Sequence, residues 1–425
     1  MDPVSITEEV REFYKRHPYP PPVENLDRYR ERWNDTQHRR ADFHLFEPAK
    51  PYCEDRTILI AGCGTSQAAK YAVRWPNAKI TGIDVSSTSI EQTGILKQKY
   101  RLDNLDVLEL PVERASELEC SFDHVVCTGV LHHLPDPDKG LQALRDVLDP
   151  EGSMHLMVYA PYGRAGIYMV QDYCRRLGIG TSSKEIADLA ASLRVLPPDH
   201  PLVPLLQNSP DFQNEAALAD ALLHPQDRSY SVDQLFEFLN RADLQFGRWI
   251  RQAPYLPQCG SLTQIPHNDL IGRLTLQEQF AAVELFRGNM LRHSAVVYHA
   301  DLAEPAQAIN FDGDGWLDYI PIPVSGTIVV EERLPAGAVA VLINRAHTQT
   351  DIYLPINTTQ KRLFDTIDGE RSIRDLVGDS SDLSEARTLF LRLWRYDQVV
   401  FDASNPSGHG GADSSQQNLS TSHDR

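Results

Sequence analysis

The sequence has few cysteines, and none of them forms a CxxC pair or has a histidine partner at the spacing of metal ligands. A disulfide framework or a cysteine-based metal site needs such an arrangement. We therefore expect reduced thiols, as in a cytoplasmic protein, and no bound metal. The six cysteines are Cys53, Cys63, Cys120, Cys127, Cys174 and Cys259.

Long apolar runs, a secretory N-terminus and an excess of basic residues are also missing. No apolar stretch approaches the roughly 20 residues that cross a bilayer, and residues 1–5 show no basic segment followed by an apolar core. The formal net charge of -18 argues against sequence-independent nucleic-acid binding, although a local basic patch could hide in this average. We expect a cytoplasmic protein without a membrane segment or a nucleic-acid partner.

The chain has 425 residues, of which 41% are hydrophobic, so it is too long for one ordinary domain and can bury a large core. We expect an N-terminal helix and a lid or linker in residues 1–50, then a main domain over 51–302. A helical, proline-broken insertion is expected at about 163–228. A small domain over 305–402 and a disordered, Ser- and Gly-rich tail over 403–425 complete this prediction.

The first helix is predicted over residues 6–16, where apolar side chains recur at helical spacing. The prolines after His17 must end it and start a stiff, extended segment. This part of the chain either packs on the core as a linker or closes over a ligand as a lid.

Strands and helices alternate from residue 56 to about 160, which is typical of a parallel sheet flanked by helices. Such a sheet binds ligands at the carboxyl ends of its strands. Two later strands would complete a seven-stranded sheet whose last strand runs antiparallel. The predicted strands are 57–61, 79–84, 106–110, 124–128, 154–159, 246–250 and 294–300, and the predicted helices are 66–74, 87–100, 138–148, 232–242 and 277–287.

Beyond residue 305 the pattern changes to short strands separated by Gly, Pro and Asn, followed by helices. This part is predicted to form a small α+β domain. Its expected strands are 326–330, 338–343 and 350–354, its expected helices are 360–367 and 383–394, and a short helical start follows 368–373.

A glycine turn follows the first strand of the main domain. Gly62 and Gly64 allow backbone to approach a ligand where a Cβ would collide. Asp84 ends the next strand 22 residues after Gly62, where a carboxylate can accept hydrogen bonds from two ribose hydroxyls. A dinucleotide site would need a third glycine where this chain has Gln67, which counts against NAD and FAD.

The run Ala61-Gly62-Cys63-Gly64-Thr65, with Asp84 and the segment 122–134, resembles the S-adenosylmethionine-dependent class I methyltransferases over roughly residues 57–160. The resemblance implies S-adenosylmethionine as cofactor. It implies that the glycine turn approaches the methionine and ribose end and that Asp84 takes the ribose hydroxyls. By the same likeness Val85 flanks the adenine, and Cys127, Thr128 and Gly129 lie beside the methionine portion.

The sequence departs from this family after the third strand, where an acid commonly accepts a hydrogen bond from the adenine amino group. Pro111 occupies this turn and has no amide hydrogen to donate. Either Glu113 replaces the missing acid, or the amides of Val112 and Glu113 contact the adenine. A solvated loop position for Glu113 is the remaining alternative.

Two further segments are candidates for the chemistry. His132 could act as a general base, although in the enzymes that this segment resembles the paired histidines mainly shape the cofactor pocket. Tyr159 and Arg164, after the fifth strand, are the candidate acceptor-site residues. Arg164 could bind a substrate carboxylate or pair with an acid of the insertion. Methyl transfer can also proceed by alignment alone.

The region 361–377 resembles, more loosely, the small winged-helix domains that bind leader peptides. This likeness implies binding of a peptide, of DNA or of a second copy of the chain, and structural or dimerising use, including a homodimer, stays open. Altogether we expect an enzyme that methylates an acceptor, with a small molecule favoured because inserted helices can enclose a pocket. The alternatives are a peptide or protein methyltransferase, and a scaffold with the cofactor fold; both would use the C-terminal domain to recognise a partner. RNA methylation is opposed by the overall acidity.

Overall fold

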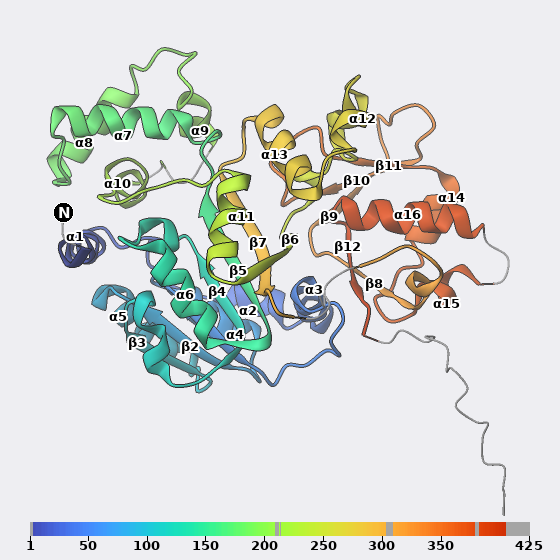
Figure 1. The fold of residues 1–425 in the computed structure, drawn as a ribbon, viewed down its shortest axis with the longest axis horizontal. Helices are drawn as coiled ribbons and strands as arrows, with labels where there is room; N and C mark the ends of the chain where they lie inside the picture. Colours follow the sequence, from blue (N-terminus) through green and yellow to red (C-terminus); the bar gives the residue numbers. More distant parts are fainter. Residues whose placement is uncertain (1–2, 209–211, 213, 303–308, 379–381, 405–425) are drawn as a thin grey trace, which may run out of the picture.

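The computed structural model describes residues 3–208, 212, 214–302, 309–378 and 382–404, and the structural statements below concern these residues. The predicted tail over 403–425 lies outside them except for residues 403 and 404. Within the described part, no helix combines the length and the apolar character needed to cross a membrane. Figure 1 shows a central sheet with its helices, a helical part beside it and a smaller C-terminal part on the opposite side.

The central sheet has seven strands in the order β3-β2-β1-β4-β5-β7-β6, as predicted. Strand β7 is antiparallel to both of its neighbours, and the first five strands run parallel to one another. The Ile, Leu and Val residues of β1, β2 and β4 are buried because helices cover both faces of the sheet, whereas the edge strand β3 is largely exposed. The strands are β1 (Thr57–Ala61), β2 (Lys79–Asp84), β3 (Leu105–Glu109), β4 (Phe122–Thr128), β5 (Leu148–Tyr159), β6 (Leu244–Trp249) and β7 (Arg292–His299).

The helices around this sheet begin and end within a few residues of the predicted bounds, because clear capping residues mark them. Ser86, Ser231 and Thr275 each accept a hydrogen bond from a backbone amide in the first turn that follows. These helices are α4 (Gln67–Arg74), α5 (Ser87–Tyr100), α6 (Pro137–Val147), α11 (Val232–Arg241) and α13 (Leu276–Arg287), with short helical turns at Val112–Leu118, Leu131–His133, Ala253–Tyr255, Gly260–Gln264 and Asn268–Ile271.

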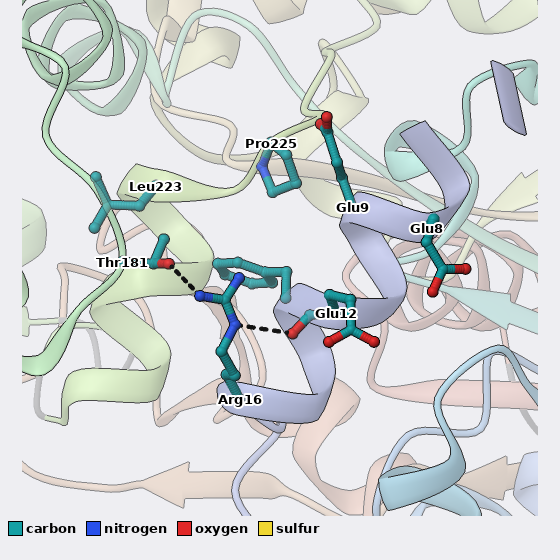
Figure 2. A pocket seen from close by; sticks show the side chains of 8 residues that line it. Glu8, Glu9, Glu12, Arg16, Thr181, Leu223 and Pro225 are labelled. Atoms are coloured by element: carbon teal, nitrogen blue, oxygen red, sulfur yellow. Dashed lines mark hydrogen bonds between the residues drawn. The ribbon is translucent and has the colours of Figure 1, made fainter. Parts of the chain in front are cut away.

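The insertion is helical, as expected, and the N-terminal helix packs against it. Phe13 of α1 (Pro3–Arg16) is buried in a cluster with Ile167, Ile186 and Leu218 of the insertion. Arg16 donates a hydrogen bond to Thr181 Oγ1 (3.3 Å) beside a hollow of about 500 Å³ that three glutamates of α1 border (Figure 2). The insertion contains α7 (Ala165–Leu177), α8 (Ser183–Leu193), α9 (Val203–Asn208) and α10 (Glu215–Leu223).

The structure adds two helices to the expected N-terminal segment, α2 (Asp27–Trp33) and α3 (Thr36–Phe46). On one side of α3, Phe46 packs on His124 of the central sheet, with ring centroids 4.5 Å apart. On its other side, Ala41 packs with Ile322 and Val400 of the C-terminal part. Residues 36–46 therefore bridge the main and C-terminal parts of the fold.

The C-terminal part contains a three-stranded sheet, a two-stranded sheet and three helices. The strand predicted at 350–354 is wrong, because the strand begins only at Leu354. Asp351 instead binds Arg287 (3.1 Å) and Ser261, which holds this stretch against the main domain. The elements are β8 (Ile320–Pro323), β9 (Thr327–Val330), β10 (Ala340–Asn344), β11 (Leu354–Ile356), α14 (Thr358–Phe364), α15 (Ile373–Val377), α16 (Leu383–Arg395) and β12 (Val399–Asp402), with a short turn at Gly315–Asp318.

A buried carboxylate ties the C-terminal part to the central sheet. Asp397 pairs with Arg248 of β6 (3.2 Å) and with His347 (3.0 Å). It also accepts hydrogen bonds from the backbone amides of Gln252 and Ala253. These contacts fix the loop around His347 beside the end of β6.

Candidate active site

A cavity of about 1350 Å³ lies at the carboxyl ends of the central strands. Parallel sheets of this kind place ligands at that edge. The cavity extends from the glycine turn after β1 to the loop 346–349 of the C-terminal part. It therefore has room for more than one small ligand.

The glycine turn after β1 is one wall of this cavity. Gly62 has φ +71° and Gly64 has φ +53°, a left-handed conformation that favours glycine. A Cβ on Gly62 would lie 2.2 Å from Val130 Cγ2, so only glycine lets Val130 pack this closely against the turn. The amides of Gly62 and Cys63 both donate to the carbonyl of Ile83 (2.9 Å), which holds the turn against β2.

Asp84 closes the same end of the cavity from β2. Its carboxylate accepts hydrogen bonds from the amides of Gly64 (2.8 Å) and Ser86 (2.9 Å). Burial raises the pKa of Asp84, and these two amide hydrogen bonds oppose the rise. A carboxylate has about four acceptor positions, so lone pairs remain for hydroxyl groups in the cavity.

Most of the residues predicted to hold a cofactor border the cavity. Ala61 and Cys127 do not, because both are fully buried in the strands beneath it. Pro111 borders the cavity together with Val112 and Glu113, and burial raises the pKa of Glu113. The predicted residues that do border the cavity are Gly62, Cys63, Gly64, Asp84, Val85, Val112, Glu113, Thr128 and Gly129.

The segment after α1 covers the glycine turn. Thr65 Oγ1 donates a hydrogen bond to the carbonyl of Pro20 (2.8 Å), and Arg11 of α1 donates to the carbonyl of Val85 (3.3 Å). Tyr19 and Pro20 are part of the cavity wall. This segment therefore packs over the glycine turn, a position that fits both a linker and a lid.

The paired histidines after β4 have different positions. His132 has no exposed surface, does not border the cavity, and neither of its ring nitrogens has a hydrogen-bond partner in the described residues. Burial, and then the charge of His133, lower the pKa of His132 well below its usual value. His133 does border the cavity, and its Nδ1 lies 2.7 Å from the carbonyl oxygen of Gln226. His133, rather than His132, can therefore reach a ligand.

Tyr159 and Arg164 both border the cavity. The guanidinium carbon of Arg164 lies 3.5 Å from the centre of the Tyr159 ring. Arg164 also pairs with Asp227 of the insertion (3.6 Å), with both side chains almost completely buried. Of the two predicted partners for Arg164, an acid on the insertion is therefore the one observed.

Asp220 and Tyr14 are two further polar residues of the cavity wall. The sequence analysis did not identify Asp220, and it gave Tyr14 no polar role. Tyr14 donates a hydrogen bond to Asp220 Oδ1 (3.0 Å), and both side chains border the cavity. Burial raises the pKa of Asp220 to about 6. These residues are 206 positions apart in α1 and α10, so no local pattern connects them.

His133 and Asp220 also belong to clusters of His and Asp side chains whose ligand atoms lie close enough together to be considered as a metal site. The ligand atoms of His133, Asp220 and His224 lie within 4.8 Å of one another, as do those of His132, His133 and Asp227. However, the rings of His133 and His224 are tilted against each other, with centroids 3.9 Å apart and planes 34° apart. One nitrogen of each ring is already engaged, because His133 Nδ1 faces the carbonyl of Gln226 and His224 Nδ1 accepts from the amide of Gln226. We assign no metal to this cluster.

Comparison with known sequences gives a local match and several partial ones. Residues 59–154 match a family model described as a methyltransferase domain. An uncharacterized protein from Synechococcus is 30% identical over 259 residues, which cover 57% of this chain and 60% of that protein. A ubiquinone biosynthesis O-methyltransferase from Paracidovorax citrulli is 29% identical, covering 28% and 54%. A trans-aconitate 2-methyltransferase from Deinococcus radiodurans is 29% identical, covering 31% and 52%. The chain thus spans at most 60% of these relatives.

Among solved structures, PKMT2 from Rickettsia typhi in complex with AdoHcy has a similar fold. The superposition has a TM-score of 0.61 and 15% sequence identity. It covers 90% of this chain and 77% of that one. At this sequence identity the likeness concerns the fold alone. Because the superposition covers 90% of this chain, it includes residues of the C-terminal part.

Proposed function

We propose that this chain, which carries a class I S-adenosylmethionine-dependent methyltransferase domain, transfers the methyl group of this cofactor to a small-molecule acceptor in the cavity. The observation that carries the proposal is the joint position of the glycine turn and Asp84 at one end of a cavity of about 1350 Å³. The rest of the cavity leaves space for the acceptor.

The residues around the glycine turn fit the cofactor. Gly62 and Gly64 border the cavity with backbone alone, Asp84 offers acceptor lone pairs to the ribose hydroxyls, and Val112 and Glu113 supply the adenine side. When bound, S-adenosylmethionine supplies an electrophilic methyl group on a sulfonium. The cover formed by Tyr19 and Pro20 excludes water from this end of the cavity. We propose two alternatives for holding the adenine: the carboxylate of Glu113, or the backbone amides of Val112 and Glu113.

Replacing Gly62 with alanine is expected to weaken the binding of S-adenosylhomocysteine at least about tenfold. The new Cβ would lie 2.2 Å from Val130 Cγ2, and the left-handed backbone costs about 1–2 kcal/mol for a residue with a side chain. Isothermal titration calorimetry measures the effect. Gly94→Ala is the matched control, because nothing lies within 4 Å of its new Cβ and helix α5 tolerates alanine. Equal affinities of the two variants would contradict the assignment of the turn.

Asp220 is the general base that we propose for an acceptor with an ionisable proton. A pKa near 6 leaves the carboxylate mostly ionised at pH 7 and still able to accept a proton. The hydroxyl of Tyr14 holds the carboxylate in place by donating to Oδ1. This proposal replaces His132, whose buried ring does not border the cavity. His133 lies beside Asp220 and can orient the acceptor.

A small-molecule acceptor is favoured because several separate parts of the chain form the wall of the cavity. Residues of α1, the insertion and the C-terminal part all contribute to its wall. The names of two relatives, ubiquinone biosynthesis O-methyltransferase and trans-aconitate 2-methyltransferase, also indicate small acceptors for those proteins. A protein acceptor is the second candidate, because the fold likeness to PKMT2 extends over 90% of this chain.

The function is tested with S-adenosylmethionine carrying a labelled methyl group. We expect the purified protein to bind S-adenosylhomocysteine in calorimetry and to transfer the label to the small-molecule fraction of a cell extract. Mass spectrometry then identifies compounds that gain one methyl group. Label in the protein fraction alone would favour the second candidate. No binding of either cofactor form would contradict the proposed function.

A further inference from the structure

Besides Arg164, four cationic side chains border the cavity, and we call the part that they line the basic chamber: Lys70, Arg74, Arg251 and Arg292. Lys70 and Arg74 lie on α4, whereas Arg251 follows β6 and Arg292 begins β7. Four acids border the cavity as well: Asp42, Asp84, Glu113 and Asp220. Among them, only Asp42 forms an ion pair with one of the four cations in the described residues.

Three separate elements direct these cations into the basic chamber. Lys70 and Arg74 lie four residues apart on the cavity face of α4. Arg292 begins β7, directly opposite Tyr159 of β5 in the antiparallel register, so both side chains lie on the same face of the sheet. Arg251 follows β6 two residues after Trp249. The chamber thus begins next to Tyr159, one of the candidate acceptor-site residues.

The charge of the chamber is only partly neutralised within the protein. Arg74 pairs with Asp42, 3.0 Å away. The side chains of Lys70, Arg251 and Arg292 have no ion pair or hydrogen bond in the part of the chain that the structure describes. This excess stands out because the chain has 41 basic residues against 59 acidic ones. Burial, followed by the charge of Arg292, lowers the pKa of Arg251, whereas the charge of Asp397 opposes this shift.

A half-buried histidine that borders the basic chamber has a nitrogen atom without a partner in the described residues. His155 Nε2 lies 2.8 Å from Ser294 Oγ, whereas its Nδ1 is buried and has no hydrogen-bond partner in the described residues. Burial, followed by the charges of Arg74, Arg292 and Arg251, lowers the pKa of His155 to about 3. The ring is therefore neutral at pH 7. Its free nitrogen is a polar group that a ligand can satisfy.

We propose that the basic chamber binds a carboxylate or phosphate group of the acceptor, so that this protein methylates an anionic small molecule. The proposal rests on the proposed function and narrows the class of its substrate. Arg251 and Arg292 provide planar guanidinium groups that match both kinds of anion, and Lys70 adds a point charge. The anion relieves the repulsion among the cations, while apolar wall residues such as Met157 and Ile250 accommodate the rest of the molecule.

The test compares four ligands that share a phenyl ring: benzoate, phenyl phosphate, benzyl alcohol and benzylamine. Each is titrated by calorimetry into protein saturated with S-adenosylhomocysteine. We expect at least one of the two anions to bind about tenfold or more tightly than the alcohol, with the amine weakest. Whichever of benzoate and phenyl phosphate binds more tightly shows whether the chamber prefers a carboxylate or a phosphate.

The double variant R251Q/R292Q is expected to weaken anion binding at least about tenfold and to leave the affinity for S-adenosylhomocysteine unchanged. R175Q/R176Q removes the same charge from the exposed end of α7 and is expected to change neither affinity. Retained anion affinity in R251Q/R292Q, or equal binding of anion and alcohol by the wild type, would overturn the proposal. An equal loss of S-adenosylhomocysteine affinity would overturn it too, because the cations would then hold the cofactor. A wild-type protein that fails to bind S-adenosylhomocysteine would instead contradict the proposed function.

Discussion

Replacing Asp84 with alanine is expected to weaken S-adenosylhomocysteine binding about 100-fold. Hydrogen bonds to a charged group contribute about 1.5–3 kcal/mol each, and the carboxylate is placed to accept from both ribose hydroxyls. The same substitution frees the amides of Gly64 and Ser86, which Asp84 holds at 2.8 and 2.9 Å. The glycine turn would therefore lose its fixed position as well as its ligand contact. Calorimetry on both proteins measures the loss.

Glu109→Ala is the matched control for this measurement. Glu109 ends β3 directly opposite Asp84 in the parallel register, but its side chain is exposed and does not border the cavity. We expect its removal to change the affinity by less than about twofold, as for most exposed surface positions. An Asp84 variant that binds as tightly as this control would show that the ribose contact has been assigned to the wrong residue.

Asp220→Asn is expected to lower kcat by about 100-fold or more, since general base catalysis contributes roughly 10²–10⁴ in rate. The amide keeps the size of the side chain and its position near the Tyr14 hydroxyl, but it cannot take up a proton. Wild-type activity should fall as the pH drops through about 6, where Asp220 becomes protonated, and the variant should lack this limb. The measurement uses the acceptor found with the labelled cofactor.

Stability provides a second measurement on the same variant. Burial raises the pKa of Asp220 from the ordinary 3.8 to about 6, so the native state favours the protonated form. Protonation of Asp220 therefore adds roughly 3 kcal/mol to the free energy of unfolding. This stabilisation is fully present below about pH 4 and is lost as the pH rises through about 6. Denaturant unfolding at several pH values should show this pH dependence of the free energy of unfolding in the wild type but not in Asp220→Asn.

Glu215→Gln, an exposed position on the same helix, is the control for Asp220→Asn and should change neither the rate nor the pH profile. Unchanged kcat in Asp220→Asn across the pH range would exclude Asp220 as the base. Methyl transfer would then depend on the alignment of the acceptor alone.

The central sheet and the glycine turn could be predicted because their signals are local. Strands such as Thr57–Ala61 are continuous apolar runs that end at glycine, and α5 starts at a capping serine and was predicted with its exact bounds. The buried parallel sheet leaves few alternatives for such a sequence. The antiparallel last strand also followed from the number of strands beyond the fifth.

Elements whose stability depends on distant partners were not predictable in the same way. Strand β8 contains Pro321 and Pro323, which normally argue against a strand. It forms because its one partner, β12, makes a sheet of two strands, in which a proline can face away from the ladder. Helix α3 lacks a clean apolar stripe, since it contacts the central sheet and the C-terminal part on different sides.

The acceptor side of the cavity was the least accessible to sequence reasoning. His132 and His133 are neighbours in the sequence, and only the packing of Tyr159 and His224 around them decides which ring meets the cavity. The basic chamber combines side chains from α4, β7 and the segment after β6, and no single stretch of sequence contains its charge pattern. The overall charge of -18 even conceals it.

The Asp397 contacts mean that the main and C-terminal parts should unfold cooperatively. Deletion of residues 305–425 would leave Arg248, which is 10% exposed, as a buried charge without its carboxylate. Loss of one partner from a buried pair costs about 3–5 kcal/mol. Such a deletion would therefore report on the integrity of β6 and of the chamber beside it rather than on recognition by the C-terminal part. Single substitutions on its exposed surface separate these two effects.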